Sequence, residues 1–277
     1  MELLLLSTIW ATIFLIGASL GSFLNVCIAR WPAEQSVVAP RSRCPRCETP
    51  IAWHDNIPVL SWLLLRGRCR SCALPISVQY PLIELAGAAI WVTAFWYFDL
   101  SFTAVRVGVA ATILLGVVMT DLRHYVIPDG FTVTGFLFAM AAAPVALFLG
   151  DLGPFAGPLD ALLGACAGAG LIAIVGWLGE VALGKEAMGQ GDVTLMAMIG
   201  AMVGPWRGFL TVFVAAALGA AVFLLVVVPI GAWRAKRRGE EFALPLVPFG
   251  VFLAPAGVVT LLWGDALIAW YIAQLVP

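Results

Sequence analysis

Two aspartates lie at the ends of apolar runs. A carboxylate in such a position is energetically costly, so it usually serves a function. Asp121 closes one run in VVMTDLRHYVIPDG (residues 117–130), and Asp192 lies in AMGQGDVTLM (residues 187–196) just before another. Ionisable residues in such positions are candidates for function. Two neighbouring carboxylates cannot both ionise cheaply, so one keeps its proton. Such a pair can activate water and protonate a carbonyl oxygen, as in acid–base peptide cleavage.

Three further residues are expected to support this pair. Gly189 and Gly191 precede Asp192 and allow a close approach by another chain, so that an extended substrate could lie against this backbone. Structural roles compete with this interpretation, because Asp192 and Asp129 could each N-cap the helix that follows. For Asp129, which follows Pro128, capping is favoured. Asp121 ends a helix, where the helix dipole disfavours an anion, and is harder to explain structurally.

Four cysteines form a second constellation. RCPRCETP supplies Cys44 and Cys47, and GRCRSCALP supplies Cys69 and Cys72, with 21 residues between the two pairs. This spacing is typical of a structural zinc site, in which each C-x-x-C turn places two thiolates on one tetrahedral ion. Disulfides or a redox dithiol are the alternatives, and they are disfavoured if the segment is cytoplasmic.

The composition places both constellations in a membrane protein. The chain has 277 residues, of which 62% are hydrophobic and only 11% are charged. A soluble domain carries about 25% charged residues. Because backbone groups in lipid must pair within one segment, we expect helices. The chain therefore reads as an all-α polytopic membrane protein of about eight transmembrane helices, one of them short, at residues 3–28, 80–98, 102–120, 131–149, 158–183, 192–204, 206–232 and 247–275.

The positive charges predict the orientation of these helices. Seven of the 15 Lys and Arg residues lie between the first two helices, and four more follow the seventh. With eight helices, these loops fall on one side, which the positive-inside rule makes cytoplasmic. We therefore expect the four-cysteine loop and both aspartates at the cytoplasmic side, and the two termini outside.

At these residues the sequence resembles a known family. DLRHYVIPD followed by GQGD is similar to the bacterial type IV prepilin peptidases, the GxGD-type membrane aspartic peptidases. The likeness extends over GSFLNVCIARWP (21–32), the two C-x-x-C pairs around HDNIPVLSWLLLRGRC (54–69), YPLIELAG (80–87), EAMGQGDVTLMAMIGA (186–201) and VPFGVFLAPAG (247–257). One position departs from the family, which often has a lysine two residues after the GxGD aspartate, where this chain has Thr194.

The resemblance implies a specific activity. Asp121 and Asp192 would be the catalytic pair, and Cys44, Cys47, Cys69 and Cys72 the zinc ligands. The family cleaves the basic leader of type IV prepilins and type II secretion pseudopilins after a glycine, at the cytoplasmic face of the bacterial inner membrane. Many members then N-methylate the new terminus with S-adenosylmethionine. Prepilins, pseudopilins and membrane lipid are the expected partners, without nucleic acid.

The resemblance also implies a domain division, and alternatives to the function remain. Residues 1–30 would be the first transmembrane helix, residues 31–79 the cytoplasmic zinc loop, and residues 80–277 a multispanning aspartic peptidase domain.

A peptidase that only cleaves is the nearest alternative. A proton-coupled transporter would use the two carboxylates differently, and a zinc-stapled scaffold would not need them.

Overall fold

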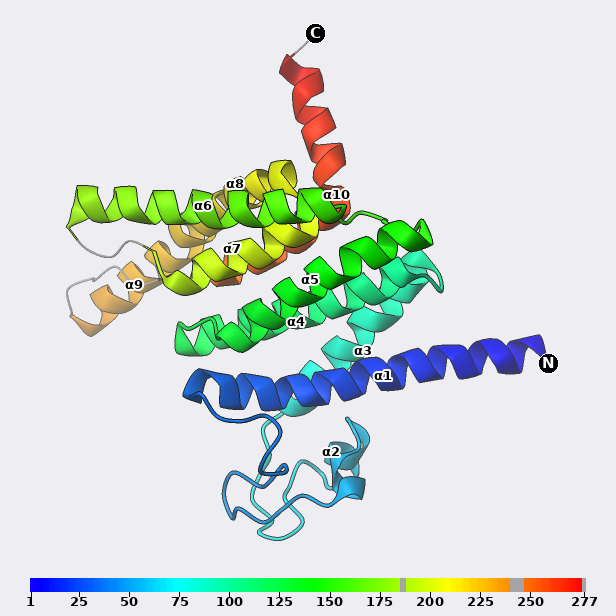
Figure 1. Cartoon of the computed structure of the whole chain (residues 1–277). Helices are drawn as coiled ribbons and strands as arrows, with labels where there is room; N and C mark the ends of the chain where they lie inside the picture. The colour runs from blue at the N-terminus through cyan, green and yellow to red at the C-terminus, as the bar shows by residue number, and fades with distance from the viewer. Residues whose placement is uncertain (185–187, 240–246, 276–277) are drawn as a thin grey trace. The chain divides into compact units, whose positions relative to one another are not determined.

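The computed structural model describes residues 1–184, 188–239 and 247–275, and most of these residues lie in helices (Figure 1). Within these residues, seven helical segments are long and apolar enough to cross a membrane, and α7 is a shorter apolar helix. This confirms the expected all-helical membrane fold. The helices are α1 (Glu2–Arg30), α3 (Gln79–Phe98), α4 (Phe102–His124), α5 (Asp129–Leu149), α6 (Pro158–Leu183), α7 (Gln190–Val203), α8 (Pro205–Val222), α9 (Val228–Arg238) and α10 (Gly250–Leu275).

The helices differ from their predicted bounds mainly at polar ends. α4 continues one turn past Asp121 to His124. α8 runs through a π-helical stretch, η3 (Phe223–Val227), directly into α9, so that this continuous helix reaches Arg238. A helix need not stop where its apolar run stops, because basic side chains at its end reach water. Residues 186 and 187, which open the glycine-containing motif, lie outside the described residues.

Proline and glycine set several helix ends. Pro158 and Pro205 occupy the first turn of α6 and α8, where a missing N–H costs nothing. Gly150 and Gly184 follow α5 and α6 in the left-handed conformation, which glycine adopts without strain. These residues explain why the long apolar runs break where they do.

The chain divides into two compact units, Met1–Gly116 and Val117–Pro277. In the first unit α1 packs along α3. A Cβ on Gly17 or Gly21 would approach the α3 backbone to 2.8 Å or less, so the two helices cross closely because these positions are glycine. The loop between them holds η1 (Trp31–Ala33), η2 (Trp53–Asn56) and α2 (Leu60–Leu64).

The second unit is built around α7. This 14-residue helix packs against α5, α6, α8 and α10, and its residues 195–203 are buried except for residue 197. A helix that is apolar all round belongs in the interior, and its length of about 21 Å falls short of a bilayer core. α7 is therefore enclosed by protein, and Asp192 lies near its exposed beginning.

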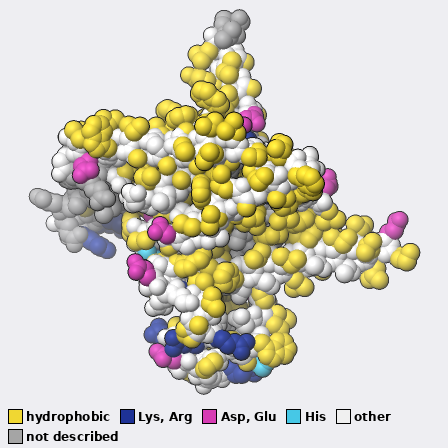
Figure 2. Space-filling model, viewed as in Figure 1, with side chains coloured by type: hydrophobic (Ala, Val, Ile, Leu, Met, Phe, Trp, Pro, Cys, Tyr) yellow, Lys and Arg dark blue, Asp and Glu magenta, His cyan; other side chains and the backbone are white. Residues whose placement is uncertain are grey.

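The outer faces of the long helices are apolar. Figure 2 shows hydrophobic side chains over most of the helical surface, and basic side chains gathered on the loop between α1 and α3. Fully or largely exposed large residues such as Leu3, Phe148 and Trp177 would be unfavourable in water. The chain is a multi-pass membrane protein, and an apolar surface of this kind suits contact with lipid.

Candidate active site and metal centre

Asp121 lies in the last turn of α4 and is 5% exposed. Its carboxylate oxygen Oδ2 accepts a hydrogen bond of 3.0 Å from the backbone N–H of Val251, and it also accepts one from the backbone of Gly250. Both donors open α10, where backbone N–H groups lack helical partners and favour an anion. The start of α10 therefore compensates for placing a carboxylate at the carbonyl end of α4.

Asp192 occupies the third position of α7 and is half-buried. The N-cap of this helix is Gly189, which excludes the alternative that Asp192 itself is the N-cap. The Asp192 carboxylate instead accepts a hydrogen bond from the backbone N–H of Gly189, while its own N–H donates to the Gly189 carbonyl at 3.1 Å. This reciprocal arrangement resembles half of a capping box, and it fixes the side chain beside the helix start.

The structure brings the two aspartates together. Asp192 interacts electrostatically with Asp121, although 71 positions separate them along the chain. Ile127 packs against Gly191, the neighbour of Asp192, and against Gly250, which donates to Asp121. A Cβ on Gly191 would lie 2.9 Å from the Ile127 Cβ, and one on Gly250 would lie 2.7 Å from its Cδ1. Repulsion between two interacting carboxylates favours one charged and one protonated member, so the two can act as an acid–base pair.

The supporting residues fall in different places. Gly191 is required by contact with Ile127 of the same chain. Gly189 is exposed, with φ −74° and ψ 148°, which other residues also adopt, and its open side faces Asp192. Asp129 is exposed at the first position of α5, where Pro128 is the N-cap and no side-chain cap is made. The favoured capping role of Asp129 is therefore wrong, although an acid there suits the helix dipole.

Sequence reasoning missed the part that α10 plays at this site. Gly250 and Val251 contact Asp121 through backbone atoms, and neither side chain announces such a contact in the sequence. The signal that could have found them is the glycine at the start of an apolar run. Thr194, where the family often has lysine, donates its hydroxyl to the Gly191 carbonyl at 3.1 Å and so braces the same turn.

The four cysteines converge in the first unit. Their sulfur atoms all lie within 4.8 Å of one another. The Sγ atoms are 3.9 Å apart for Cys44 and Cys72, and 4.0 Å apart for Cys47 and Cys69. A tetrahedral Zn²⁺ with Zn–S bonds of about 2.3 Å needs sulfur atoms about 3.8 Å apart. The four-cysteine cluster therefore fits a tetrahedral metal ion.

Two equivalent turns present these cysteines. Cys44 and Cys69 each donate their backbone N–H to the carbonyl five residues later, and each accepts from the residue four later. Each turn needs one residue with positive φ, Glu48 at 55° and Ala73 at 58°. The repeated pattern R-C-x-x-C-x-x-P, at residues 43–50 and 68–75, is the sequence signal for this pair of turns.

Local hydrogen bonds prepare this centre. Hydrogen bonds from the hydroxyl and the backbone of Thr49 lower the pKa of Cys47 to about 6, which favours the thiolate form that a metal ligand needs. Asp55 on η2 accepts two hydrogen bonds from Arg70, at 2.7 and 2.6 Å, and these bonds lower the pKa of Asp55. The ion pair ties η2 to the second cysteine turn.

A multi-pass helical membrane protein with an interacting aspartate pair and a four-cysteine metal centre defines a narrow class, and sequence comparisons agree with it. Residues 15–98 match the model of the bacterial peptidase A24 N-terminal domain, and residues 107–224 match that of the type IV leader peptidase family. The first match contains the four cysteines, and the second contains both aspartates. The chain belongs to the type IV leader peptidase family.

Individual relatives carry the same description. The chain is 36% identical over 281 residues to a prepilin leader peptidase/N-methyltransferase of Stutzerimonas stutzeri, covering 93% of this chain and 91% of that protein. It is 41% identical over 230 residues to one from Myxococcus xanthus, covering 83% of this chain and 66% of the relative. The Pseudomonas aeruginosa protein of that description is 33% identical over 282 residues, covering 93% and 91%. No solved structure matches the chain.

Proposed function

We propose that the chain removes the basic leader from type IV prepilins and type II secretion pseudopilins, and then N-methylates the new terminus. The observation that carries the proposal is the meeting of Asp121 and Asp192 at the ends of two helices within a leader peptidase chain. Prepilin leader cleavage and N-methylation are also the activities in the names of its relatives.

The aspartate pair performs the cleavage. The ionised member takes a proton from water, which attacks the scissile carbonyl, and the protonated member donates to the carbonyl oxygen. Collapse of the tetrahedral intermediate expels the new amine, which receives the proton held by the first carboxylate. Gly189 leaves the space beside Asp192 open to an extended substrate.

The position of the pair suits a substrate that is partly in the membrane. Both aspartates lie at the helix ends that the positive-inside rule places on the cytoplasmic side of the bacterial inner membrane. A basic leader stays in the cytoplasm, while the apolar helix of the substrate lies in lipid. The scissile bond, which follows a glycine, therefore reaches the depth of the aspartates.

The four cysteines hold a structural zinc ion. The loop of residues 31–79 contains only three short helical turns, so it cannot bury much apolar surface, and a metal supplies the missing stability. S-adenosylmethionine, when bound, supplies the methyl group for the second reaction. The binding site for S-adenosylmethionine is distinct from the aspartate pair that cleaves the leader.

A mass measurement tests both activities. The purified chain in liposomes would receive a prepilin with a basic leader, with S-adenosylmethionine present, and the product would be weighed intact. We expect loss of the leader and a gain of one methyl group. Leader loss without the methyl group would exclude the second activity, and an uncleaved prepilin would exclude the first.

A further inference from the structure

The connection between α4 and α5 places one buried apolar side chain beside the aspartate pair. Ile127 is 9% exposed, whereas residues 122–126 before it are all exposed. The connection begins at Tyr125, whose backbone N–H donates to the Asp121 carbonyl at 3.0 Å and whose φ is 54°. It ends at Pro128, the N-cap of α5. Ile127 therefore lies on a short segment that is held at both ends and starts from the turn of Asp121.

The two ends of the Ile127 side chain contact two different helix starts. A Cβ on Gly191, the second residue of α7, would lie 2.9 Å from the Ile127 Cβ and 3.5 Å from its Cγ1. A Cβ on Gly250, the first residue of α10, would lie 2.7 Å from the Ile127 Cδ1. Both contacts are so close that only glycine fits them. Ile127 therefore fixes how near the start of α7 can come to the start of α10.

Ile127 is also a rigid residue for this purpose. Branching at its Cβ leaves few favourable χ1 rotamers. Because proline follows it, its backbone is restricted to extended conformations. An unbranched side chain of similar volume, such as methionine, would bend and adapt to its neighbours. The separation of the two helix starts is therefore set by a group with little freedom of its own.

The two helix starts that Ile127 contacts are those that position the carboxylates. Gly191 directly precedes Asp192, and Gly250 donates a backbone hydrogen bond to Asp121. A shift of either glycine therefore moves one carboxylate relative to the other. Acid–base catalysis requires both groups within hydrogen-bond reach of the reacting atoms, and a displacement of about 1 Å can cost roughly 100-fold in rate.

We propose that Ile127 is a positioning residue for leader cleavage, which sets the separation of Asp121 and Asp192 by keeping the starts of α7 and α10 at a fixed distance. The proposal rests on the proposed catalytic role of the aspartate pair. It assigns a part in the reaction to a buried hydrocarbon side chain that carries no reactive group. Its effect belongs to the chemical step, so it is expected in kcat and not in KM.

Ile127→Val tests this role with a small change. The substitution removes Cδ1, the atom nearest to Gly250, and keeps the branched Cβ beside Gly191. Initial rates of leader cleavage in liposomes, measured by intact mass over a range of prepilin concentrations, would give kcat and KM. We expect kcat to fall about 10-fold with KM nearly unchanged, because a group that acts only on the reaction geometry does not alter substrate binding.

Ile199→Val is the matched control. Ile199 on α7 is 1% exposed, and its Cδ1 meets Gly257 of α10, where an added Cβ would lie 3.1 Å away. The same methyl group is thus removed between the same two helices, but Ile199 and Gly257 lie about two helical turns from Asp192 and Gly250. We expect both variants to lower the unfolding temperature in detergent by similar amounts, and Ile199→Val to keep the wild-type kcat.

A double variant tests whether Ile127 acts through Gly250. The Cβ added by Gly250→Ala would collide with the Ile127 Cδ1, and in Ile127→Val that atom is absent. We therefore expect Gly250→Ala to reduce kcat by a smaller factor in the Ile127→Val background than in the wild type, since residues in contact are not additive. Equal factors in the two backgrounds would overturn the proposal.

The remaining outcomes separate this proposal from the proposed function. A wild-type kcat in Ile127→Val would overturn the positioning role, and an increase in KM at unchanged kcat would mean that Ile127 binds the substrate instead. An equal fall in kcat for Ile199→Val would reduce the effect to a general loss of packing. The catalytic role of the pair fails on a different result, which is cleavage by Asp192→Asn at the wild-type rate.

Discussion

At the scale of single residues, the position of Asp121 depends on backbone 130 residues later in the chain. The N–H of Val251 holds the carboxylate, and Gly250 leaves just enough room for it. Asp192 is held within its own turn by Gly189. The two carboxylates are therefore positioned mainly by backbone N–H donors, which are neutral and held in fixed orientations.

Gly250→Ala should disturb this arrangement. The new Cβ would lie 2.8 Å from Asp121 Oδ2 and 2.7 Å from Ile127 Cδ1, so the carboxylate must shift. A displacement of about 1 Å at a reacting group can cost roughly 100-fold in rate. We expect leader cleavage to fall by about that factor with membrane insertion unchanged, as measured by the initial rate in liposomes.

Gly219→Ala is the matched control for this substitution. Its Cβ would make ordinary contacts of 3.4 Å or more with Phe252, so cleavage should stay near the wild-type rate. Equal rates for Gly250→Ala and wild type would show that the Asp121 position is not critical.

The sequence singled out both aspartates and Gly189, but not the contacts that the start of α10 makes with Asp121. Asp121 and Asp192 were recognisable because each follows or opens an apolar run. The capping role favoured for Asp129 is wrong, and the capping alternative for Asp192 is excluded, because a cap depends on which residue first departs from helical geometry. Gly189 and Pro128 occupy those positions. The role of Gly250 depends on tertiary contacts with Asp121 and Ile127, which local patterns do not contain.

At the scale of elements, α6 and α7 cross at a point where each helix has a glycine. A Cβ on Gly164 would collide with the Gly200 backbone, and a Cβ on Gly200 with the Gly164 backbone. Close approach of this kind is how helices gain packing contacts in lipid, where the hydrophobic effect between them is weak. The crossing holds α7, and therefore Asp192, in place.

Gly200→Ala should destabilise this crossing. Overpacking typically costs about 1–3 kcal/mol, and here the obstructing atoms are backbone, which cannot rotate away. We expect a lower unfolding temperature in detergent. Gly170→Ala on α6, where nothing lies within 4 Å of the new Cβ, should leave that temperature unchanged or slightly higher. Equal unfolding temperatures for the two variants would contradict the close crossing.

Cys44→Ser tests the element formed by the two cysteine turns. Removing one of four thiolates should abolish tight zinc binding, so elemental analysis should fall from about one equivalent per chain toward zero. Cys166→Ser, at an exposed cysteine on α6 outside the cluster, should keep the metal. Undiminished zinc in Cys44→Ser would refute the four-ligand site.

The sequence was sufficient to predict that each long helix exists, but not the residues at which the helices end. The apolar runs gave every long helix, because length and hydropathy decide whether a segment can enter lipid. The extension of α8 through η3 and α9 was missed, since Arg234 and the basic residues after it look like a loop in sequence. The interior position of α7 follows only from its packing against four other helices.

At the scale of the whole molecule, the loop charges predict the orientation in the membrane. Alkaline phosphatase needs disulfides and therefore folds only outside the cytoplasm. A fusion after Asp151 should be active, because that loop lacks basic residues, and a fusion after Gly239 should be inactive. Activity with the reverse pattern would place the cysteine loop and both aspartates on the wrong side for a basic leader.

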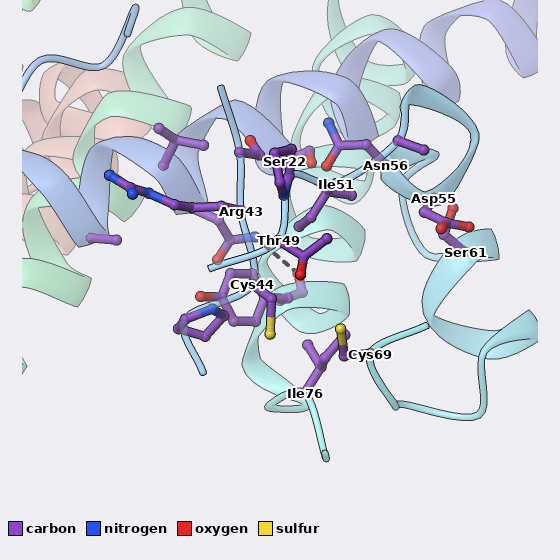
Figure 3. A pocket seen from close by; sticks show the side chains of 18 of the residues that line it. Ser22, Arg43, Cys44, Thr49, Ile51, Asp55, Asn56, Ser61, Cys69 and Ile76 are labelled. Atoms are coloured by element: carbon purple, nitrogen blue, oxygen red, sulfur yellow. Dashed lines mark hydrogen bonds between the residues drawn. The ribbon is translucent and has the colours of Figure 1, made fainter. Parts of the chain in front are cut away.

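The sequence also predicted the family, because six different motifs of that family occur along the chain in the family's order. It could not predict the cavity lined by Ser22, Cys44 and Glu84 among others (Figure 3), which forms only when residues 31–79 fold against α1 and α3. Motifs report single segments, whereas an enclosed space belongs to several segments together.

The most direct test of the central claim compares leader cleavage by wild type, Asp192→Asn and Asp129→Asn. All three would receive the same prepilin in liposomes, with intact mass as the readout. Losing one member of an acid–base pair typically costs about 10²- to 10⁴-fold. We predict such a loss for Asp192→Asn and a much smaller change for Asp129→Asn. Cleavage by Asp192→Asn at the wild-type rate would mean that Asp192 only stabilises the start of α7, and that the carboxylate pair does not cleave the leader.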